Sequence, residues 1–324
     1  MFRTSLSSGV FACFFCTVLG AQPPPDARVA ILSTLNNRWT EGATSFVAEL
    51  QRLGYVEGRN LTLDYLLAED KPARLAELAG QLVGRKPDVI LSMGTVDSSL
   101  AAMKGTATIP IVFVHSADAV RAGLVMSLSR PGGNVTGITS LNADLNVKRL
   151  ELIIEIVPRV RRVAVLVSPV DPATPSMVEA LKSYALLRGV DLDFVQILDS
   201  ARLGRVVSDA ARAGAGAILV MGSPPLARHM PSLAQLALEQ RLPTVTPWRE
   251  FSEKGLLVSY GNPSSEMFQR AAGMVDRILR GAKPADMPVE QPTKFELIIN
   301  LNTAKALGLT IPEPILERAN YFIQ

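Results

Sequence analysis

Arg28-Val29-Ala30-Ile31-Leu32 and Arg162-Val163-Ala164-Val165-Leu166 are two apolar stretches of nearly the same sequence, 134 residues apart. Each is short and rich in aliphatic residues, as a strand buried on both faces requires. Two further echoes follow at similar offsets and in the same order: Gly222 repeats Gly94, and Leu242-Pro243 repeats Ile109-Pro110. Three echoes in one order at a nearly constant offset predict two lobes of the same topology.

Segments with helical periodicity separate the apolar stretches. In the segment 42–53, Phe46, Val47, Leu50 and Leu53 fall on one face, and Gly54 follows at the position of a helix C-cap. Strands and helices alternate in this way along the chain, which predicts parallel sheets covered by helices on both faces. The predicted strands are 28–33, 60–67, 88–93, 109–115, 135–140, 255–260 and 295–301, and the predicted helices include 42–53, 72–85, 96–104 and 263–280.

The expected fold class is α/β, with two doubly wound parallel-sheet lobes joined by a hinge of several segments. If the chain crossed between the lobes once, the second lobe would be considerably larger than the first. Returning the helix 263–280 to the first lobe balances them and gives three crossings, near residues 140, 260 and 295. The first lobe is then 26–139 plus 262–290, and the second is 140–261 plus 291–324.

The N-terminal stretch predicts export. Arg3 is its only charge, an apolar run from Val10 to Leu19 follows, and Gly20 and Ala21 precede three prolines. A short apolar run with a positive start and a small-residue exit is typical of a secretory signal peptide, here residues 1–21, and implies a periplasmic protein. An inserted N-terminal anchor is the alternative. Cleavage would remove Cys13 and Cys16, the only cysteines, and with them any disulfide or thiolate site.

Charge and motif patterns argue against nucleic-acid binding and against catalysis. The 33 basic and 30 acidic residues alternate along the chain, so no basic face is expected. No glycine-rich turn follows the first strand and no Gly-x-Ser-x-Gly elbow occurs, so neither a dinucleotide enzyme nor a hydrolase is expected. The two histidines are His115, at a strand end, and His229, expected on a surface helix. No metal-ligand spacing is present, and no cofactor is predicted.

Several longer motifs resemble a known family. They are Leu53-Gly54-Tyr55-Val56-Glu57-Gly58-Arg59-Asn60, Ser127-Leu128-Ser129-Arg130-Pro131-Gly132-Gly133-Asn134, Lys148-Arg149-Leu150-Glu151-Leu152 and Pro288-Val289-Glu290-Gln291-Pro292-Thr293-Lys294-Phe295-Glu296-Leu297. After residue 27 the chain is similar to the ABC-transporter substrate-binding family that includes tryptophan- and tyrosine-binding proteins. That resemblance implies a type I periplasmic-binding fold, a small organic solute such as an aromatic amino acid, an ABC permease in the inner membrane as partner, and a monomer.

The resemblance leaves two points open. Relatives commonly carry an arginine in the second strand, where this chain reads Asp64-Tyr65-Leu66-Leu67-Ala68-Glu69, so the identity of the solute is in doubt. They also often have a glycine pair where Lys254-Gly255 stands, and an aspartate where Asn320 stands. The same lobes would also serve a ligand sensor that presents its solute to a receptor instead of a permease.

Candidate ligand contacts follow from the rule that ligands bind beyond the carboxyl ends of parallel strands. In the first lobe, Gly94 and Thr95 open a helix whose free amides suit a carboxylate, and Asp118 suits an ammonium group. The alternative roles are helix caps for the serines and threonines, a turn-ordering role for Asp118, and packing under its own loop for Trp248. The full set is Ser33, Thr34, Gly94, Thr95, Ser116 and Asp118 from the first lobe, Ser168, Ser223 and Trp248 from the second, and Ser140 and Tyr260 from the hinge.

Overall fold

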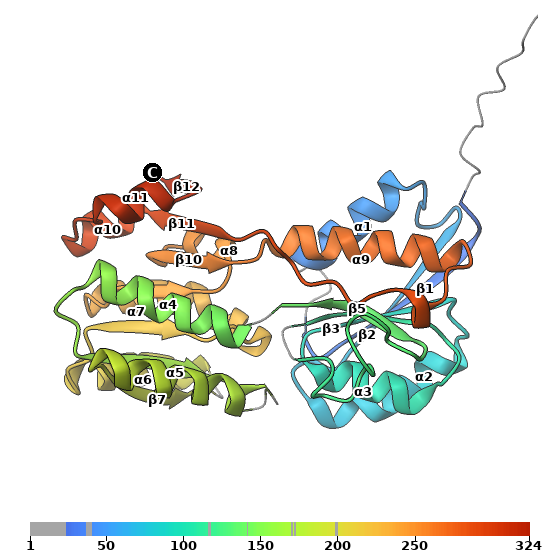
Figure 1. Ribbon diagram of the computed structural model, residues 1–324, viewed down its shortest axis with the longest axis horizontal. Helices are drawn as coiled ribbons and strands as arrows, with labels where there is room; N and C mark the ends of the chain where they lie inside the picture. The colour runs from blue at the N-terminus through green and yellow to red at the C-terminus, as the bar shows by residue number, and fades with distance from the viewer. Residues whose placement is uncertain are drawn as a thin grey trace, which may run out of the picture.

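A computed structural model describes residues 24–36, 41–115, 118–140, 142–169, 171, 173–197 and 200–324. It shows two lobes side by side, each a sheet with helices on both faces (Figure 1). The predicted signal peptide lies outside the described residues. Among the helices of the described ranges, none has both the length and the apolar character needed to cross a bilayer.

The first lobe is built on a five-stranded parallel sheet of order β2-β1-β3-β4-β5. Helices α1 and α9 bury Phe46, Leu50 and Phe268 against one face, and α2 and α3 bury Leu78, Leu82 and Ala102 against the other. Its elements are β1 (Ala27–Ser33), α1 (Glu41–Arg52), β2 (Leu61–Leu67), η1 (Pro72–Arg74), α2 (Leu75–Gly84), β3 (Val89–Met93), α3 (Val96–Gly105), β4 (Ile111–His115), β5 (Val135–Thr139), α9 (Ser264–Leu279) and η4 (Pro284–Asp286).

The second lobe repeats this topology and extends it. Its sheet has the order β12-β11-β10-β9-β8-β6-β7, so the five strands β7-β6-β8-β9-β10 match the order of the first sheet. The matched strands β1 and β6 are the two stretches of similar sequence, which confirms the predicted duplication. Its elements are α4 (Asn142–Ile156), β6 (Arg162–Val167), α5 (Thr174–Arg188), β7 (Asp191–Gln196), η2 (Ser200–Arg202), α6 (Leu203–Arg212), β8 (Ala217–Val220), η3 (Pro224–His229), α7 (Met230–Glu239), β9 (Thr244–Thr246), α8 (Arg249–Glu253), β10 (Val258–Gly261), β11 (Glu296–Asn300), α10 (Leu301–Leu307), α11 (Glu313–Arg318) and β12 (Tyr321–Ile323).

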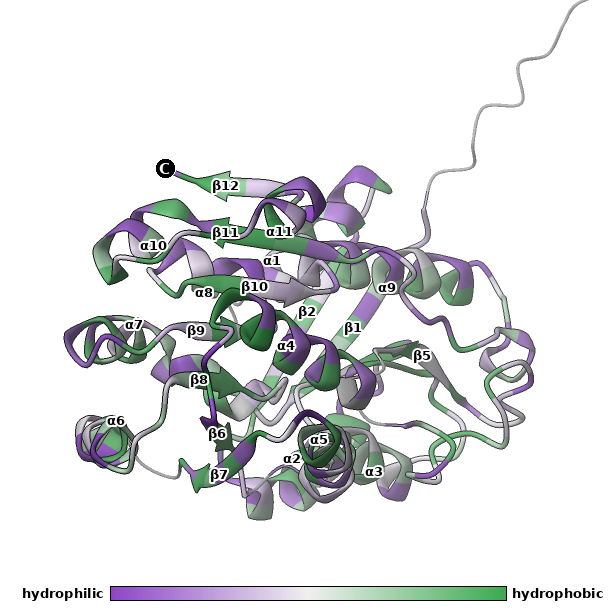
Figure 2. Cartoon of the chain, turned by 60° about the vertical axis from the view of Figure 1, so that its left-hand side comes forward, coloured by the Kyte–Doolittle hydropathy of each residue, from purple (hydrophilic) through white to green (hydrophobic). Residues whose placement is uncertain are grey.

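The burial pattern follows the sequence pattern. Strands β3, β4, β5, β8 and β9 are buried at every position, as strands covered on both faces must be. In helices α1, α4 and α9, hydrophobic and hydrophilic residues recur with the helical period (Figure 2). Each helix therefore has an apolar face, which it turns toward its sheet. Each lobe therefore has two apolar layers, one on either side of its sheet.

The chain passes between the sheets at three places. It leaves the first sheet after β5, returns from β10 into α9, and enters the second sheet again at β11. The returning segment is fixed to β5, because Glu290 accepts a hydrogen bond from the Thr139 amide and donates its own amide to Gly137. The crossings lie side by side near the middle of the molecule (Figure 1).

The structure corrects three local predictions. The second sheet is mixed, because β11 runs antiparallel to β10. The predicted helix 72–85 begins as a 3-10 turn, and the α-helix starts only at Leu75. Strand β4 begins at Ile111 rather than 109, since Pro110 lacks the amide hydrogen that would extend the ladder.

Candidate functional site

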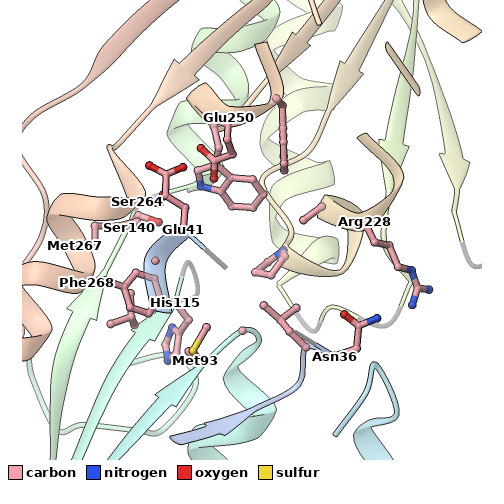
Figure 3. Close-up of a pocket in the computed structure, with 18 of the residues that line it drawn as sticks. Asn36, Glu41, Met93, His115, Ser140, Arg228, Glu250, Ser264, Met267 and Phe268 are labelled. Carbon is pink, nitrogen blue, oxygen red and sulfur yellow. The ribbon is translucent and has the colours of Figure 1, made fainter. Parts of the chain in front are cut away.

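A cavity of about 370 Å³ lies between the two lobes. That volume is within the range of pockets that enclose small organic ligands, roughly 300–1,000 Å³. Elements of both lobes contribute to it, including the starts of α1, α8 and α9 (Figure 3). Its lining residues are Leu35, Asn36, Glu41, Gly42, Asp70, Met93, Gly94, Val114, His115, Ser140, Pro224, Ala227, Arg228, Trp248, Glu250, Phe251, Lys254, Ser264, Met267 and Phe268.

Aromatic and sulfur-containing side chains form the apolar part of the lining. Trp248 follows strand β9 and packs edge-on against Phe251, with 5.3 Å between the ring centroids. From the other lobe, Phe268 of α9 lies against α1 at Gly42, where a Cβ atom would come within 2.3 Å of the ring. Gly42 thus lets this ring sit at the cavity wall. A solute with a flat or apolar portion would be covered from both lobes.

The loop after β3 approaches the cavity with its backbone. Gly94 has a φ of 94°, a conformation that L side chains rarely adopt, and a Cβ there would lie 2.2 Å from the Thr34 hydroxyl. The Thr95 amide donates to that same hydroxyl at 3.0 Å. The pair fixes the loop so that Gly94 lines the cavity. The Thr95 amide, however, already has a partner within the protein.

His115 is the last residue of β4, and Ser140 directly follows β5. His115 is 6% exposed, stacks on Phe113 and has no hydrogen-bond partner at either ring nitrogen among the described residues. Burial lowers the pKa of His115 to about 3, so its imidazole is neutral at physiological pH and a poor base there. The Ser140 amide donates to the His115 carbonyl, which holds both residues at the cavity.

Two glutamates from opposite lobes meet at one end of the cavity. Glu41 is the first residue of α1, and Glu250 lies in the first turn of α8. Their carboxyl groups lie close together in the cavity (Figure 3), near enough for the charge of Glu41 to act on Glu250. Burial, reinforced by the negative charge of Glu41, raises the pKa of Glu250 to about 7. This end of the site therefore holds two carboxyl groups and titrates near neutrality.

An ion pair joins the lobes at another side of the cavity. Asp70, just after β2, accepts a hydrogen bond from the Arg228 guanidinium at 2.5 Å. Asp70 has a φ of 57°, and Glu69 before it has a φ of 55°, so this turn is held in a strained backbone conformation. The contact is made only where the lobes are this close together.

Three of the predicted contacts line the cavity, namely Gly94, Ser140 and Trp248. Most of the others are bonded within their own lobe. The Ser33 hydroxyl accepts from the Leu35 amide, Thr34 accepts from Thr95, the Thr95 hydroxyl bonds to Asp97, and Ser223 donates to Asp171. The Ser168 hydroxyl is buried and has no partner within the described ranges.

The remaining three predicted contacts are Ser116, Asp118 and Tyr260. Ser116 lies outside the described residues. The exposed Asp118 carboxylate accepts from the amides of Val120 and Arg121, which orders its own turn. Tyr260 stacks on Phe295 at the crossing between lobes, and its carbonyl accepts from Arg149.

Sequence reasoning missed most of the charged and apolar lining. Glu41 and Glu250 lie in first helical turns and Phe268 lies in the second turn of α9, whereas the candidates were sought at strand ends. Glu250 is two residues past Trp248, so extending each strand-end loop into the first helical turn would have included it. His229, expected on a surface helix, is instead buried at 1% exposure. The described residues contain no cluster of three His, Cys, Asp or Glu side chains suited to a metal.

Known proteins resemble this chain in sequence and in fold. A curated tyrosine-binding protein from Clostridioides difficile is 28% identical over 82% of this chain and 75% of its own length. A Streptococcus pneumoniae ABC domain solved in complex with L-tryptophan is 24% identical, with a TM-score of 0.82 over 92% of this chain and 100% of that one. A ligand-free, open substrate-binding protein with adhesive properties from Clostridium difficile is 26% identical, with a TM-score of 0.64 over 92% and 99%.

A family model described as ABC transporter substrate binding protein matches residues 35–323. The match spans both lobes, the three crossings and every lining residue of the cavity. The chain belongs to the ABC transporter substrate-binding protein family.

Proposed function

We propose that this protein captures an aromatic amino acid, or a similar small organic solute, in the cavity between its lobes and delivers it to an ABC permease in the inner membrane. The observation that carries the proposal is a cavity of ligand size walled by Trp248 and Phe268 from opposite lobes. The tyrosine-binding relative supports an amino acid as the solute. The protein acts as a periplasmic monomer after loss of residues 1–21, binding its solute without cofactor or turnover.

In this proposal the contacts to the solute come from Gly94, Ser140 and Trp248. The hydroxyl residues Ser33, Thr34, Thr95, Ser168 and Ser223 shape the strand-end loops that hold those contacts in place. The lobes, 26–139 plus 262–290 and 140–261 plus 291–324, move as units about the three crossings. Small residues at or beside the crossings, such as Gly261, suit such a hinge.

Closure of the lobes on the solute is part of the proposal. The chain is closer in shape to the tryptophan-bound relative than to the ligand-free open one, although its sequence identity to the open one is slightly higher. The Asp70–Arg228 ion pair bridges the lobes in this arrangement. These observations support a closed state that a bound solute would stabilise, with an open state in its absence.

Small-angle scattering tests capture and closure together. We expect saturating L-tyrosine or L-tryptophan to reduce the radius of gyration, because closing the lobes expels water from the cleft. D-Ribose serves as the control and should leave the radius unchanged. A radius of gyration that stays unchanged with both amino acids, at concentrations where calorimetry shows a saturated protein, would contradict closure. Calorimetry that detects no binding of either amino acid would contradict capture.

A further inference from the structure

We propose that Glu41 and Glu250 form an ammonium subsite assembled from both lobes, so that the captured solute must carry a protonated amine. The inference rests on the proposed function and narrows it from small organic solutes to amine-bearing ones. It assigns the recognition of positive charge to these two side chains, at the end of the cavity opposite Met93 and His115 (Figure 3).

The two acids of the pair come from different lobes. Glu41 belongs to the first lobe and Glu250 to the second, and both line the cavity. Two carboxylates that lie this close together cannot both be ionised without strong repulsion. The contact therefore needs either a shared proton or a cation. In the closed arrangement a cation from the solute would meet two acceptors from different lobes at once.

The charges around the pair leave room for one cation. Burial, reinforced by the nearby Glu41, raises the pKa of Glu250, so Glu250 is the group that holds a proton in the ligand-free closed form. Lys254 is the basic residue of the lining closest in sequence, and its charge has only a small lowering effect on the Glu250 pKa. Arg249, the other basic residue of this turn, is bonded to Glu253.

The adjoining wall also suits a cation. An ammonium group has three donors, which can satisfy both carboxylates and one further acceptor. Trp248 and Phe268 present aromatic rings to the same cavity, and aromatic faces attract cations once water is excluded. An anionic or purely neutral solute would leave the acid pair facing a group that cannot compensate it.

Buried polar atoms elsewhere in the cavity point independently to a bound molecule. Both ring nitrogens of His115 and the Ser264 hydroxyl lack partners among the described residues, and both side chains line the cavity. Buried polar groups are almost always hydrogen-bonded, so a solute is the natural source of the missing bonds. Because His115 is neutral, it suits an uncharged or hydrogen-bonding portion of the solute, away from the ammonium end.

Calorimetry on matched variants tests the subsite. The variants are Glu41→Gln and Glu250→Gln, with Glu253→Gln on the same helix as the control, since Glu253 bonds to Arg249 and does not line the cavity. With L-tyrosine as the probe, each of the first two should weaken binding by about ten- to thirtyfold, as expected for loss of a charged hydrogen bond. The control should stay within about twofold. Because Gln keeps the shape of each side chain and prevents repulsion between the two acids, the ligand-free melting temperature should be unchanged or higher.

Ligand analogues isolate the amine. We expect 3-(4-hydroxyphenyl)propionate, which differs from tyrosine by the amine, to bind at least about thirtyfold more weakly than tyrosine. Tyramine keeps the amine and lacks the carboxylate, and its binding should remain sensitive to Glu41→Gln and Glu250→Gln. In the Gln variants, the deaminated acid should bind only slightly more weakly than tyrosine. The amine that this acid lacks and the carboxylate that the variant lacks belong to one contact, so losing both costs little more than losing one.

A pH series gives a readout that a merely structural role would not produce. A protonated Glu250 blocks the ammonium, so binding strengthens as pH rises through about 7. Tyrosine affinity should therefore rise between pH 6 and pH 7.5, because a growing fraction of Glu250 is ionised and free to accept the ammonium group. Glu41 and Lys254 face Glu250 in the site, and Glu250→Gln should abolish the rise while Glu253→Gln keeps it.

The outcomes separate the inference from the proposed function. The ammonium subsite is overturned if the native protein and the three variants bind tyrosine equally, or if the native protein binds the deaminated acid as tightly as tyrosine. Either result leaves amino-acid capture standing. Tyramine binding that the Gln variants lose, without any amino-acid binding, supports the subsite and overturns amino-acid capture. Absence of binding by tyrosine, tryptophan and tyramine alike overturns both.

Discussion

An Arg149→Ala variant is expected to lose about 3–5 kcal/mol of unfolding free energy, the largest effect of any substitution considered for this chain. Arg149 of α4 is 1% exposed and is the largest of the fully buried side chains. Its Nε donates to the Tyr260 carbonyl at 2.8 Å, and its Nη1 donates to the Asn146 side-chain oxygen at 2.6 Å. The same Asn146 oxygen accepts from the Gly222 amide.

This network ties the first turns of α4 to the ends of β8 and β10. Both α4 and β10 adjoin crossings between the lobes, so Arg149 holds two hinge segments to one sheet. Among the described residues no carboxylate pairs with the guanidinium, and burial lowers the pKa of Arg149 to about 9. Truncation would remove the guanidinium donor from the Tyr260 carbonyl and one of the two donors from the Asn146 oxygen. It would also leave a large void, and both effects destabilise.

Urea unfolding followed by circular dichroism and by tryptophan fluorescence measures the loss, and agreement of the two probes checks that unfolding is two-state. Lys148→Ala is the matched control, because the neighbouring Lys148 is half-exposed and pairs with Glu151 on one helix face. It should change stability by less than about 0.5 kcal/mol. The loss of unfolding free energy in Arg149→Met should lie between those of Arg149→Ala and Lys148→Ala, because the Met side chain refills most of the void. A loss below about 1 kcal/mol for Arg149→Ala would show that the network is not structural.

A Trp248→Ala variant is expected to bind L-tyrosine and L-tryptophan about a hundredfold more weakly than the native protein, equivalent to roughly 2.7 kcal/mol. Trp248 provides the largest aromatic surface of the lining and comes from the lobe that closes over the first. Removing it exposes one face of the solute to water and removes an aromatic ring two residues from Glu250.

Two controls make the Trp248 result specific. Trp248→Phe should recover most of the affinity, because Phe251 packs edge-on against the indole and would still support a smaller ring. Tyr321→Ala removes an exposed aromatic side chain of the same lobe, which stacks with Arg249 and does not line the cavity. This variant should bind both amino acids with native affinity. Calorimetry gives the affinities. Native binding by Trp248→Ala would exclude this side chain from the site.

Much of the fold follows from the sequence because the pattern that specifies it is repeated. The strands β1 and β6 carry the same apolar signal, and the glycines after β3 and β8 mark the same strand end in both lobes. The antiparallel strand β11 could not be read from periodicity, because a short apolar run has the same pattern in either direction. Its direction is set by the crossing that precedes it.

The residues of the ligand site were harder to predict from the sequence than the fold, because some of them meet only across the two lobes. The strand-end rule finds Gly94, Ser140 and Trp248, whose positions depend on one lobe alone. Glu41 and Glu250 become neighbours only when the two lobes face each other, and nothing in the separation of residues 41 and 250 signals that contact. Hydroxyls such as those of Ser33 and Ser223 occupy strand ends as well, and their local hydrogen bonds are visible only in three dimensions.

Mass spectrometry of the small molecules released when natively purified protein is denatured tests the central claim most directly. The account predicts that one compound is recovered, in an amount approaching one per chain, and that it carries a primary amine and an aromatic portion. The same compound should raise the melting temperature when it is added back to the emptied protein. Recovery of a sugar, or of an acid without an amine, as the molecule that rebinds and stabilises the protein would contradict the account.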